Sequence, residues 1–436
     1  MKKLKWLNTE LVFYVAIFCL PFENFFFAPS SGWAAISPII LGLYILLNYK
    51  LVFKAIIKLR KIFAFFLAAI ILGSLTASLN NVNVTDYFNS FIPLILGAVS
   101  LLSFYIFYQK KKDLSVIVNL VVIAYAICLV IGFFEYLAIK LDNDSFANWL
   151  SDIFKRDYLT TNNRVQFFFT EPSFIGMHLF GILTPLYFLS RRKDLLFIIG
   201  LFIISSLIFN SGVRVIVDVI VVAFITFSYL LVKHKKILFI PLILLIVGIS
   251  FAHIYNSNTR VRKIVNDGIY ADGSLASRYF RIQSSVIGYS KTPAQSLIGY
   301  GLGNAIKPIH LGYDEAYDKY ESSYKREVID LDSKSTTFHD DSVAYSLYIR
   351  MISEFGLIMT IIAIVFLAKL TKNSILPQRW LYFAIIMYIY VQFESLGFYA
   401  IWFFVLTMMF TAKNEITEKT LIERIADNTF KRKAKR

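Results

Sequence analysis

The sequence predicts an all-α membrane protein, a bundle of about twelve transmembrane helices with one large extracytoplasmic loop between the ninth and tenth spans. Three observations lead to this prediction. Of the 436 residues, 57% are hydrophobic and only 17% are charged, which is too little charge to cover a soluble chain of this length. The apolar residues fall in long runs, and the basic residues gather in short clusters between them. Soluble and disordered classes are therefore excluded.

The apolar runs each have about the length that crosses a bilayer core of roughly 30 Å. They lie at 9–28, 32–49, 62–79, 89–109, 115–139, 173–190, 195–210, 212–232, 237–253, 343–368, 379–395 and 397–412. These runs divide the chain into four parts. The parts are spans one to nine at 1–253, an extracytoplasmic loop with short amphipathic helices at 254–342, spans ten to twelve at 343–412, and a basic cytoplasmic tail at 413–436.

The net charge of +16 is distributed in a way that indicates topology. If the N-terminus is cytoplasmic, every basic cluster that flanks a span falls on the cytoplasmic side. These clusters are Lys50 to Lys61, Lys110 to Lys112, Arg191 to Lys193, Lys233 to Lys236, Lys369 to Arg379 and Lys431 to Arg436. Both termini are then inside, and 140–172 and 254–342 are outside. The basic residues are thus a topology signal, and we expect no nucleic-acid partner.

Ionisable residues at membrane depth are costly, so they are candidates for a functional site. Arg214 follows a polar turn at the predicted outer start of the eighth span, and Asp218 lies four residues further on the same helical face. Two interpretations of this Arg214–Asp218 pair are open. The pair neutralises itself and fixes the helix, or Arg214 is an anion clamp that faces an outward cavity.

The large loop carries a second arginine pair. Arg278 and Arg281 are three residues apart, so a helix would project both in one direction. The turn 299–303 contains three glycines and could cradle a phosphate. However, no strand precedes this turn and no Lys-Ser or Lys-Thr follows it, so nucleotide binding is not expected.

Two further boundary sites combine polar and aromatic residues. His339, Asp340 and Asp341 directly precede the tenth span, either as a helix cap or as catalytic groups. No set of ligands converges there at metal-binding spacing, so no metal is predicted. Arg164, an aromatic run and Glu171 precede the sixth span, either as ordinary helix-start chemistry or as a sugar-binding shelf.

The order of these features resembles the O-antigen polymerase and ligase superfamily of polytopic glycosyltransferases. An arginine opens a span, Ser277-Arg278 lies in the large loop, and the glycine turn ending in Asn304 follows. His339 and the sequence Glu354-Phe355-Gly356-Leu357 come next. The Phe-Thr-Glu-Pro-Ser stretch favours the polymerase branch. The chain departs from the family pattern in two places, with Asp340 for the usual asparagine and Met359 for the second glycine.

The resemblance implies an undecaprenyl-pyrophosphate-linked oligosaccharide as the donor, in the cytoplasmic membrane of a bacterium, with an extracytoplasmic active site. The resemblance also implies membrane lipid and a chain-length regulator protein as partners. An acceptor sugar hydroxyl attacks the anomeric carbon of the donor, and the pyrophosphate leaves. Arg214 and Arg278 would stabilise the pyrophosphate, because a guanidinium group matches phosphate oxygens in a fork, and His339 would be the base. Substrate positioning would fall to Arg281, Arg164, Glu171 and Asp340, with no cofactor and no metal.

Two alternatives remain open. A ligase of the same superfamily would move finished glycan onto a lipid or another cell-surface acceptor. A flippase or transporter for lipid-linked oligosaccharide belongs to a different class. Transporters usually carry their ionisable or broken-helix sites near the bilayer midplane, often in related halves. Here the candidate charges lie at the outer edge of the membrane and the halves differ, which counts against transport.

Overall fold

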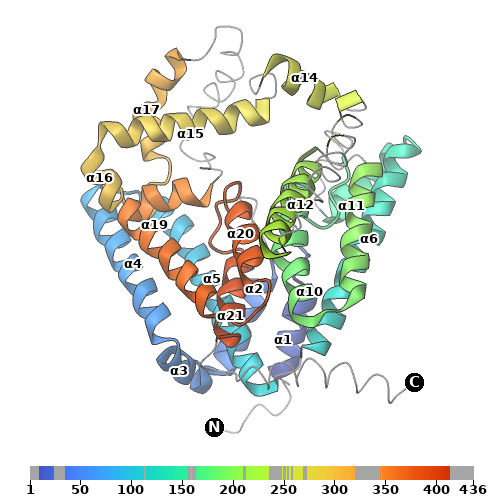
Figure 1. Cartoon of the computed structure of the whole chain (residues 1–436), viewed down its shortest axis with the longest axis horizontal. Coiled ribbons are helices and arrows are strands. Elements are labelled where there is room, and N and C mark those ends of the chain that lie inside the picture. The colour runs from blue at the N-terminus through green and yellow to red at the C-terminus, as the bar shows by residue number, and fades with distance from the viewer. Residues whose placement is uncertain are drawn as a thin grey trace.

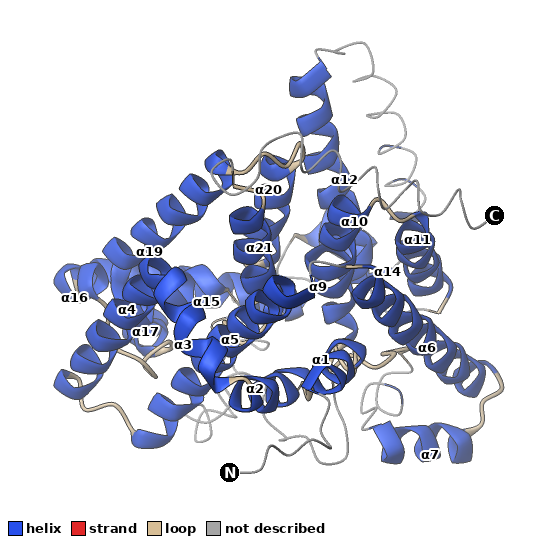
Figure 2. Ribbon diagram, turned by 90° about the horizontal axis from the view of Figure 1, so that it is seen from below, coloured by secondary structure: helices blue, strands red, loops and turns tan. Residues whose placement is uncertain are grey.

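The described part of the chain is built from helices and connecting segments and contains no strand (Figure 2). The computed structural model describes residues 9–23, 35–111, 114–154, 159, 164–209, 213–234, 248, 252, 255–256, 259–268, 273–319, 344 and 346–412. The first helices are α1 (Thr9–Phe18), α2 (Ser37–Leu47), α3 (Tyr49–Lys58), α4 (Arg60–Leu79), α5 (Val84–Lys111), α6 (Ser115–Lys140) and α7 (Asp144–Phe154).

The middle and end of the chain continue this pattern (Figure 1). One span is assembled from short pieces, namely η1 (Pro172–Phe174), α9 (Ile175–His178), the π-helical η2 (Leu179–Leu183) and α10 (Thr184–Ser190). The next two helices are α11 (Lys193–Ile208) and α12 (Val213–His234). The remaining helices are α14 (Thr259–Asp267), α15 (Gly273–Lys291), α16 (Pro293–Ile298), α17 (Lys307–Asp318), α19 (Leu347–Asn373), α20 (Arg379–Ile389) and α21 (Tyr399–Phe410).

Six helical segments among the described residues are long and apolar enough to cross a membrane, and the bent pair α2–α3 makes a seventh if it is one span. The six are α4, α5, α6, Pro172–Ser190, α12 and α19. A helix occurs in each predicted apolar run except 237–253, which lies almost entirely outside the described residues. The all-α class with membrane-spanning helices is thus confirmed. The count of twelve stays a prediction, because α1, α20 and α21 have only 10 to 12 residues.

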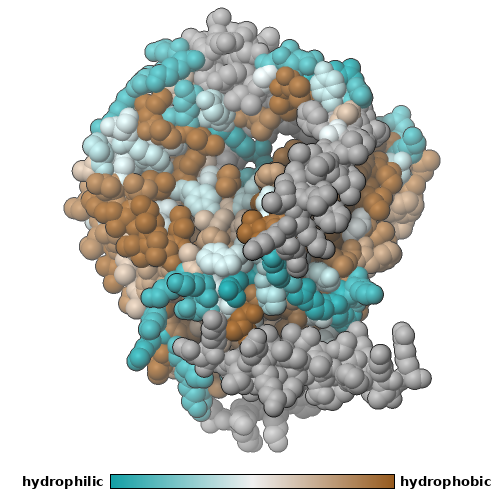
Figure 3. Space-filling view, viewed as in Figure 1, coloured by the Kyte–Doolittle hydropathy of each residue, from teal (hydrophilic) through white to brown (hydrophobic). Residues whose placement is uncertain are grey.

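The flank of the bundle formed by α4 shows why these helices belong in a bilayer. Leu67, Ile71, Leu75 and Leu79 recur every four residues along one face of α4, and each is more than half exposed. Such a stripe is unfavourable in water but suits contact with lipid chains. Figure 3 shows hydrophobic side chains over α4 and α19, with hydrophilic ones near α17 and, at the other end, near α3.

Helices α15 and α17 pack tightly against each other at the end of the bundle where α4 finishes and α5 starts (Figure 1). We call this end of the bundle the loop end. The close approach depends on two glycines. A Cβ on Gly288 would lie 2.0 Å from the Pro308 carbonyl oxygen, and one on Gly312 would lie 2.0 Å from that of Ser284. Between the two helices lies a small apolar core made of Phe280, Ile287 and Ala316.

The glycine turn 299–303 holds the hairpin formed by α15 and α17 against the rest of the bundle. The Tyr300 amide donates to the Ser353 carbonyl of α19 at 2.6 Å, and the Leu302 amide donates to the Gly73 carbonyl of α4 at 3.0 Å. The φ angle of Gly301 is +101°, and a Cβ there would lie 2.2 Å from the Ala77 amide nitrogen. The proposed phosphate cradle is therefore wrong, because the turn packs its backbone against protein and its amides donate to protein acceptors.

Replacing Gly301 with alanine is expected to prevent the turn from docking. The positive φ alone costs an L-residue about 1–3 kcal/mol, and the contact with α4 leaves no room for the added methyl group. The measurement is the melting temperature of the purified protein in detergent. Gly200→Ala in α11 is the matched control, since nothing lies within 4 Å of the Cβ position there. An unchanged melting temperature in Gly301→Ala would contradict the packing described above.

Candidate functional site

Polar side chains converge at the loop end where α12 begins. The Asp218 carboxylate is 1% exposed, and its Oδ1 accepts hydrogen bonds from the Tyr388 hydroxyl at 2.6 Å and from Gln392 Nε2 at 2.7 Å. Arg214 Nη2 donates to the backbone carbonyl of Gln392 at 3.1 Å. Arg214 and Asp218 therefore both contact Gln392, which lies in the segment 390–398 between α20 and α21. The Asp218 carboxylate takes these two hydrogen bonds from α20 and from this segment rather than from Arg214.

The second arginine predicted from the sequence reaches the same place. The positive charges of Arg214 and Arg278 both act on the Asp218 carboxylate, although Arg278 comes from α15. We call Arg214, Asp218, Arg278, Tyr388 and Gln392 the arginine cluster. Its two arginines outnumber its one carboxylate, so the ionisable groups of the cluster favour an anion. Arg281, three residues after Arg278 on α15, is only 5% exposed.

Segment 164–171 runs from Arg164 to Glu171. Its first half is held by Glu135 of α6. Glu135 is fully buried, and its Oε2 accepts hydrogen bonds from the backbone amides of Gln166 at 2.7 Å and Phe167 at 2.9 Å. A carboxylate that accepts backbone amides in this way makes strong, charge-assisted hydrogen bonds. The conformation of the segment therefore depends on a carboxylate that is distant in the sequence.

A second buried carboxylate holds the far end of the same segment. Glu23 Oε2 accepts a hydrogen bond from the Thr170 amide at 2.9 Å, while its Oε1 lies 2.8 Å from Nε2 of His178. The other ring nitrogen, Nδ1, lies 2.7 Å from the Tyr125 hydroxyl oxygen. Glu23, His178 and Tyr125 are all completely buried. His178 is thus a buried core residue whose two ring nitrogens both have partners.

The aromatic run within this segment does not form a sugar-binding shelf. Phe167, Phe168 and Phe169 are buried in the main hydrophobic core, so their rings are not available to a substrate. That interpretation of the sequence is wrong for these three residues. Glu171 is half-buried and accepts a hydrogen bond from the Ser173 hydroxyl at 2.8 Å, and Arg164 is half-buried as well.

The chain that follows Glu171 borders the arginine cluster. A Cβ on Gly176 would lie 2.1 Å from Asp218 Oδ2, so a glycine is needed for the carboxylate to approach α9. The ring of Phe174 packs edge-on against Phe393 in segment 390–398, with their centroids 5.3 Å apart. Phe174 and Gly176, which follow Glu171 in the chain, therefore lie beside segment 390–398 and Asp218.

Replacing Glu135 with glutamine is expected to destabilise segment 164–171. The neutral amide keeps one acceptor oxygen but loses the charge, and hydrogen bonds to charged groups contribute about 1.5–3 kcal/mol each. The melting temperature in detergent should fall, and proteolysis within the segment should accelerate. Glu171→Gln is the matched control from the same region, since its carboxylate accepts a hydrogen bond from the Ser173 hydroxyl, two residues away, at 2.8 Å. Equal melting temperatures for the two variants would refute the anchoring role of Glu135.

A second set of polar and charged side chains lies beside the arginine cluster. We call its residues the ion-pair cluster, namely Ser90, Arg350, Glu354 and Glu394. Glu354 Oε1 accepts hydrogen bonds from the Ser90 hydroxyl at 2.5 Å, from the Gly303 amide at 3.3 Å and from Arg350 Nε at 3.4 Å. Arg350 also donates to Ser90 at 2.8 Å, and its Nη1 lies 3.9 Å from Glu394 Oε1. One arginine thus lies between two carboxylates.

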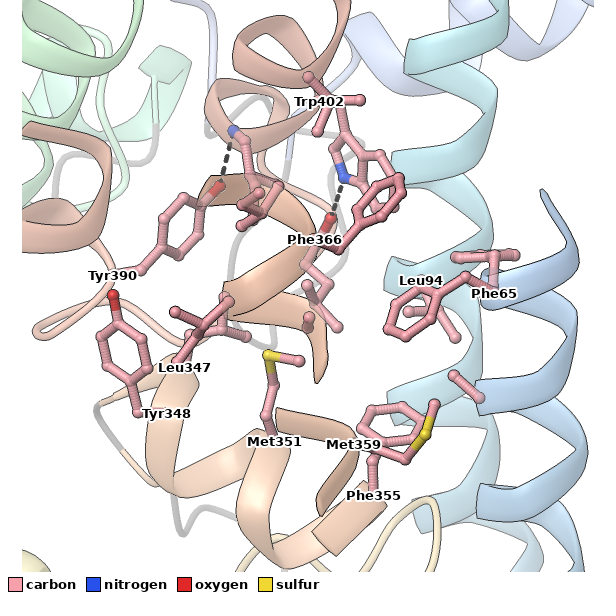
Figure 4. Close-up of a pocket in the computed structure, with 18 of the residues that line it drawn as sticks. Phe65, Leu94, Leu347, Tyr348, Met351, Phe355, Met359, Phe366, Tyr390 and Trp402 are labelled. Atoms are coloured by element: carbon pink, nitrogen blue, oxygen red, sulfur yellow. Dashed lines mark hydrogen bonds between the residues drawn. The ribbon is translucent and has the colours of Figure 1, made fainter. Parts of the chain in front are cut away.

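An apolar groove runs along α19 away from the ion-pair cluster (Figure 4). Side chains from α4, α5, α19, α20 and α21 line it. The labelled residues include Phe65 of α4, Leu94 of α5, Met351 and Met359 of α19, and Trp402 of α21. Met351 directly follows Arg350 in α19, so one end of the groove lies beside the ion-pair cluster.

The sequence predicted part of this site and missed the rest. His339 and Asp340 lie outside the described residues. Arg350, Glu394 and Gln392 were not singled out, although Arg350 and Glu394 are ionisable residues inside predicted apolar runs. Such residues are functional candidates by default, so this signal was present in the sequence.

The fold and these clusters define a membrane-embedded helical protein with a charged site, bearing two arginines, at one end of its bundle. Comparison of the chain with protein-family models, with curated proteins and with solved structures found no match. The evidence on function therefore comes from the residues of this chain and from their geometry.

Proposed function

We propose that this chain is a polysaccharide polymerase of the O-antigen or capsule type. It would transfer an undecaprenyl-pyrophosphate-linked glycan onto another lipid-linked repeat unit. The observation that carries the proposal is the convergence of Arg214 and Arg278, from α12 and α15, on one carboxylate at the loop end. Two guanidinium groups suit the oxygens of a departing pyrophosphate, and they stabilise the charge that develops as the glycosidic bond breaks.

The apolar groove supports a lipid-linked substrate. A polyprenyl chain is long and wholly apolar, and the groove offers an apolar path beside α4 and α19, two spanning helices that are mostly exposed on the outside of the bundle. Its charged end lies near the arginine cluster, because Leu396 lines the groove and Gln392, four residues earlier, contacts Arg214. The tail of the donor would lie in the groove and its pyrophosphate at the arginines.

The distribution of basic residues supports an extracytoplasmic loop end. At the opposite end of the bundle, Lys110 donates to Asn48 at 2.6 Å and Arg191 donates to Gln378 at 2.6 Å. Basic residues are enriched on the cytoplasmic side of membrane proteins. We infer that this end faces the cytoplasm of a bacterium, with both termini on that side, twelve spans in all and the large loop outside.

In the proposed reaction, the acceptor sugar hydroxyl attacks the anomeric carbon of the donor while undecaprenyl pyrophosphate leaves. Arg214 and Arg278 neutralise the leaving group, and no metal or cofactor takes part. Glu171 and Arg164 belong to the segment that borders the arginine cluster and would position the acceptor, and Arg281 supports Arg278 from the same helix. The predicted roles of His339 as base and of Asp340 in binding concern residues outside the described part.

Deletion of the gene in its own host tests this function. Surface glycan is separated on a gel, and the lipid-linked intermediates are analysed in parallel. Loss of the ladder with a single repeat unit still delivered supports a polymerase. Long chains that accumulate on undecaprenyl pyrophosphate would indicate a ligase, and single repeats retained on the cytoplasmic face would indicate a flippase. An unchanged ladder would refute all three functions.

A further inference from the structure

Helix α7 has an apolar side that is wider than its contact with α6. The apolar residues on this side recur three or four positions apart and are Phe146, Trp149, Leu150 and Ile153. Leu150 is 2% exposed and belongs to a small core with Ala138 of α6. Trp149, by contrast, is 55% exposed, and Ile153 is 38% exposed. The apolar side of α7 therefore continues beyond its contact with α6.

An exposed apolar stripe on α6 leads to the same place. Its residues are exposed, lie three or four positions apart on one side of the helix, and are Ile123, Ile127, Val130 and Phe134. Since α6 is long and apolar enough to cross a membrane, this stripe, like that of α4, suits contact with lipid chains. Helix α6 starts where α5 ends, so the stripe finishes toward the loop end.

Aromatic rings join the stripe of α6 to α7. The chain turns between the two helices at Asp142, whose φ angle is +50°, and Figure 2 shows α7 beyond the end of α6. The ring of Phe134 meets that of Phe146 edge-on, with their centroids 6.5 Å apart, and Phe146 stacks on Trp149 at 5.9 Å. The lipid-facing surface of α6 is therefore continuous with the exposed apolar side of α7.

The other side of α7 is polar. Ser145, Asn148 and Asp152 are exposed there. The 11 residues of α7 make a helix about 16 Å long, which is too short to cross a bilayer. A helix with one polar and one apolar side suits the interface between headgroups and acyl chains, where the amphipathic ring of a tryptophan is also favoured.

We propose that α7 is a membrane-surface helix, with Trp149 and Ile153 inserted among the lipids of the leaflet at the loop end. The partner is the bilayer itself, because the apolar side of α7 extends a surface of α6 that suits lipid chains. The polar side, with Asp152, remains in water. This inference is independent of the proposed function, since it uses only a spanning helix and the helix that follows it.

Spin labels on the full chain test the position of α7. The native cysteines are replaced with alanine, and single labelling sites are introduced by Trp149→Cys, Ile153→Cys, Asn148→Cys and Asp152→Cys. Electron paramagnetic resonance in vesicles of phosphatidylethanolamine and phosphatidylglycerol compares collisions with oxygen, which concentrates in lipid, and with a water-soluble nickel chelate. The oxygen-to-nickel ratio should be several-fold higher at the first two positions than at the last two, which are the matched controls on the polar side.

A second measurement uses the native side chain. The fluorescence of the wild type and of Trp149→Phe is compared in vesicles whose phosphatidylcholine is brominated either near the headgroup or deep in the acyl chains. The difference between the two proteins isolates the emission of Trp149. Its quenching should be stronger with the bromines near the headgroup, because the ring lies at the interface.

Three results would overturn the inference. Equal nickel collision rates on both sides of α7 would place the whole helix in water. Low rates for both reagents at positions 149 and 153 would show that protein, such as a second copy of this chain, covers the apolar side. Emission of Trp149 that neither brominated lipid quenches would show that the ring does not reach the bilayer.

Discussion

Replacing Arg214 with alanine is expected to reduce chain elongation by about 10²–10³-fold, the effect of removing one group that stabilises developing negative charge. The same loss is expected for Arg278→Ala, because both guanidinium groups act at Asp218 and would share the departing pyrophosphate. Both variants should still insert into the membrane and fold. The measurement is the ladder of surface glycan in a deletion strain that expresses each variant at wild-type level.

Two controls make this experiment specific. Arg262→Ala removes an arginine from α14, where the guanidinium donates to the Asn256 carbonyl at 2.6 Å and is not part of the arginine cluster. It should leave the ladder unchanged. Arg214→Lys keeps the charge but loses the fork that binds two oxygens, so its activity should lie between wild type and alanine. Wild-type chain lengths in Arg214→Ala would refute the clamp.

Replacing Arg350 with methionine is expected to cause the largest loss of stability, about 3–5 kcal/mol. The change leaves the Glu354 carboxylate buried with its counter-charge removed, and Glu394 remains close by without the arginine between them. A buried carboxylate without a cation is costly because it has lost its hydration. Thermal unfolding of the purified protein in detergent measures the effect, and Arg262→Met, on the exposed helix α14, should unfold like wild type.

A double variant distinguishes loss of charge balance from loss of packing. Arg350→Met combined with Glu354→Gln removes both charges of the closest pair and keeps side chains of similar size. Since replacing both partners of a buried ion pair is often close to neutral, the double variant should regain most of the lost stability. A double variant that is no more stable than Arg350→Met alone would show that the charge of Glu354 does not cause the loss.

The order of the site residues in the chain does not reveal which of them meet. Arg214 and Gln392 are 178 positions apart, and Ser90 and Glu354 are 264 positions apart, yet each pair is joined by a direct hydrogen bond. The glycine turn joins the second of these contacts, because the Gly303 amide donates to the same Glu354 oxygen at 3.3 Å. From the sequence, the three spaced glycines of this turn permit a phosphate cradle as well as a tight packing contact. Its actual partner is the backbone of α4, which no local pattern identifies.

The membrane class, the helices in the described apolar runs and the choice of Arg214 and Arg278 as candidates followed from the sequence alone. Hydropathy and charge clusters are local properties, so they can be read along the chain without knowing the fold. Only the tertiary structure decided that the charges of Arg214 and Arg278 both act on Asp218, that Glu23 and Glu135 hold segment 164–171, and that Glu394 lies beside Arg350. These are pairings between distant segments, and their energy depends on burial and on hydrogen-bond geometry, which arise only when the helices pack.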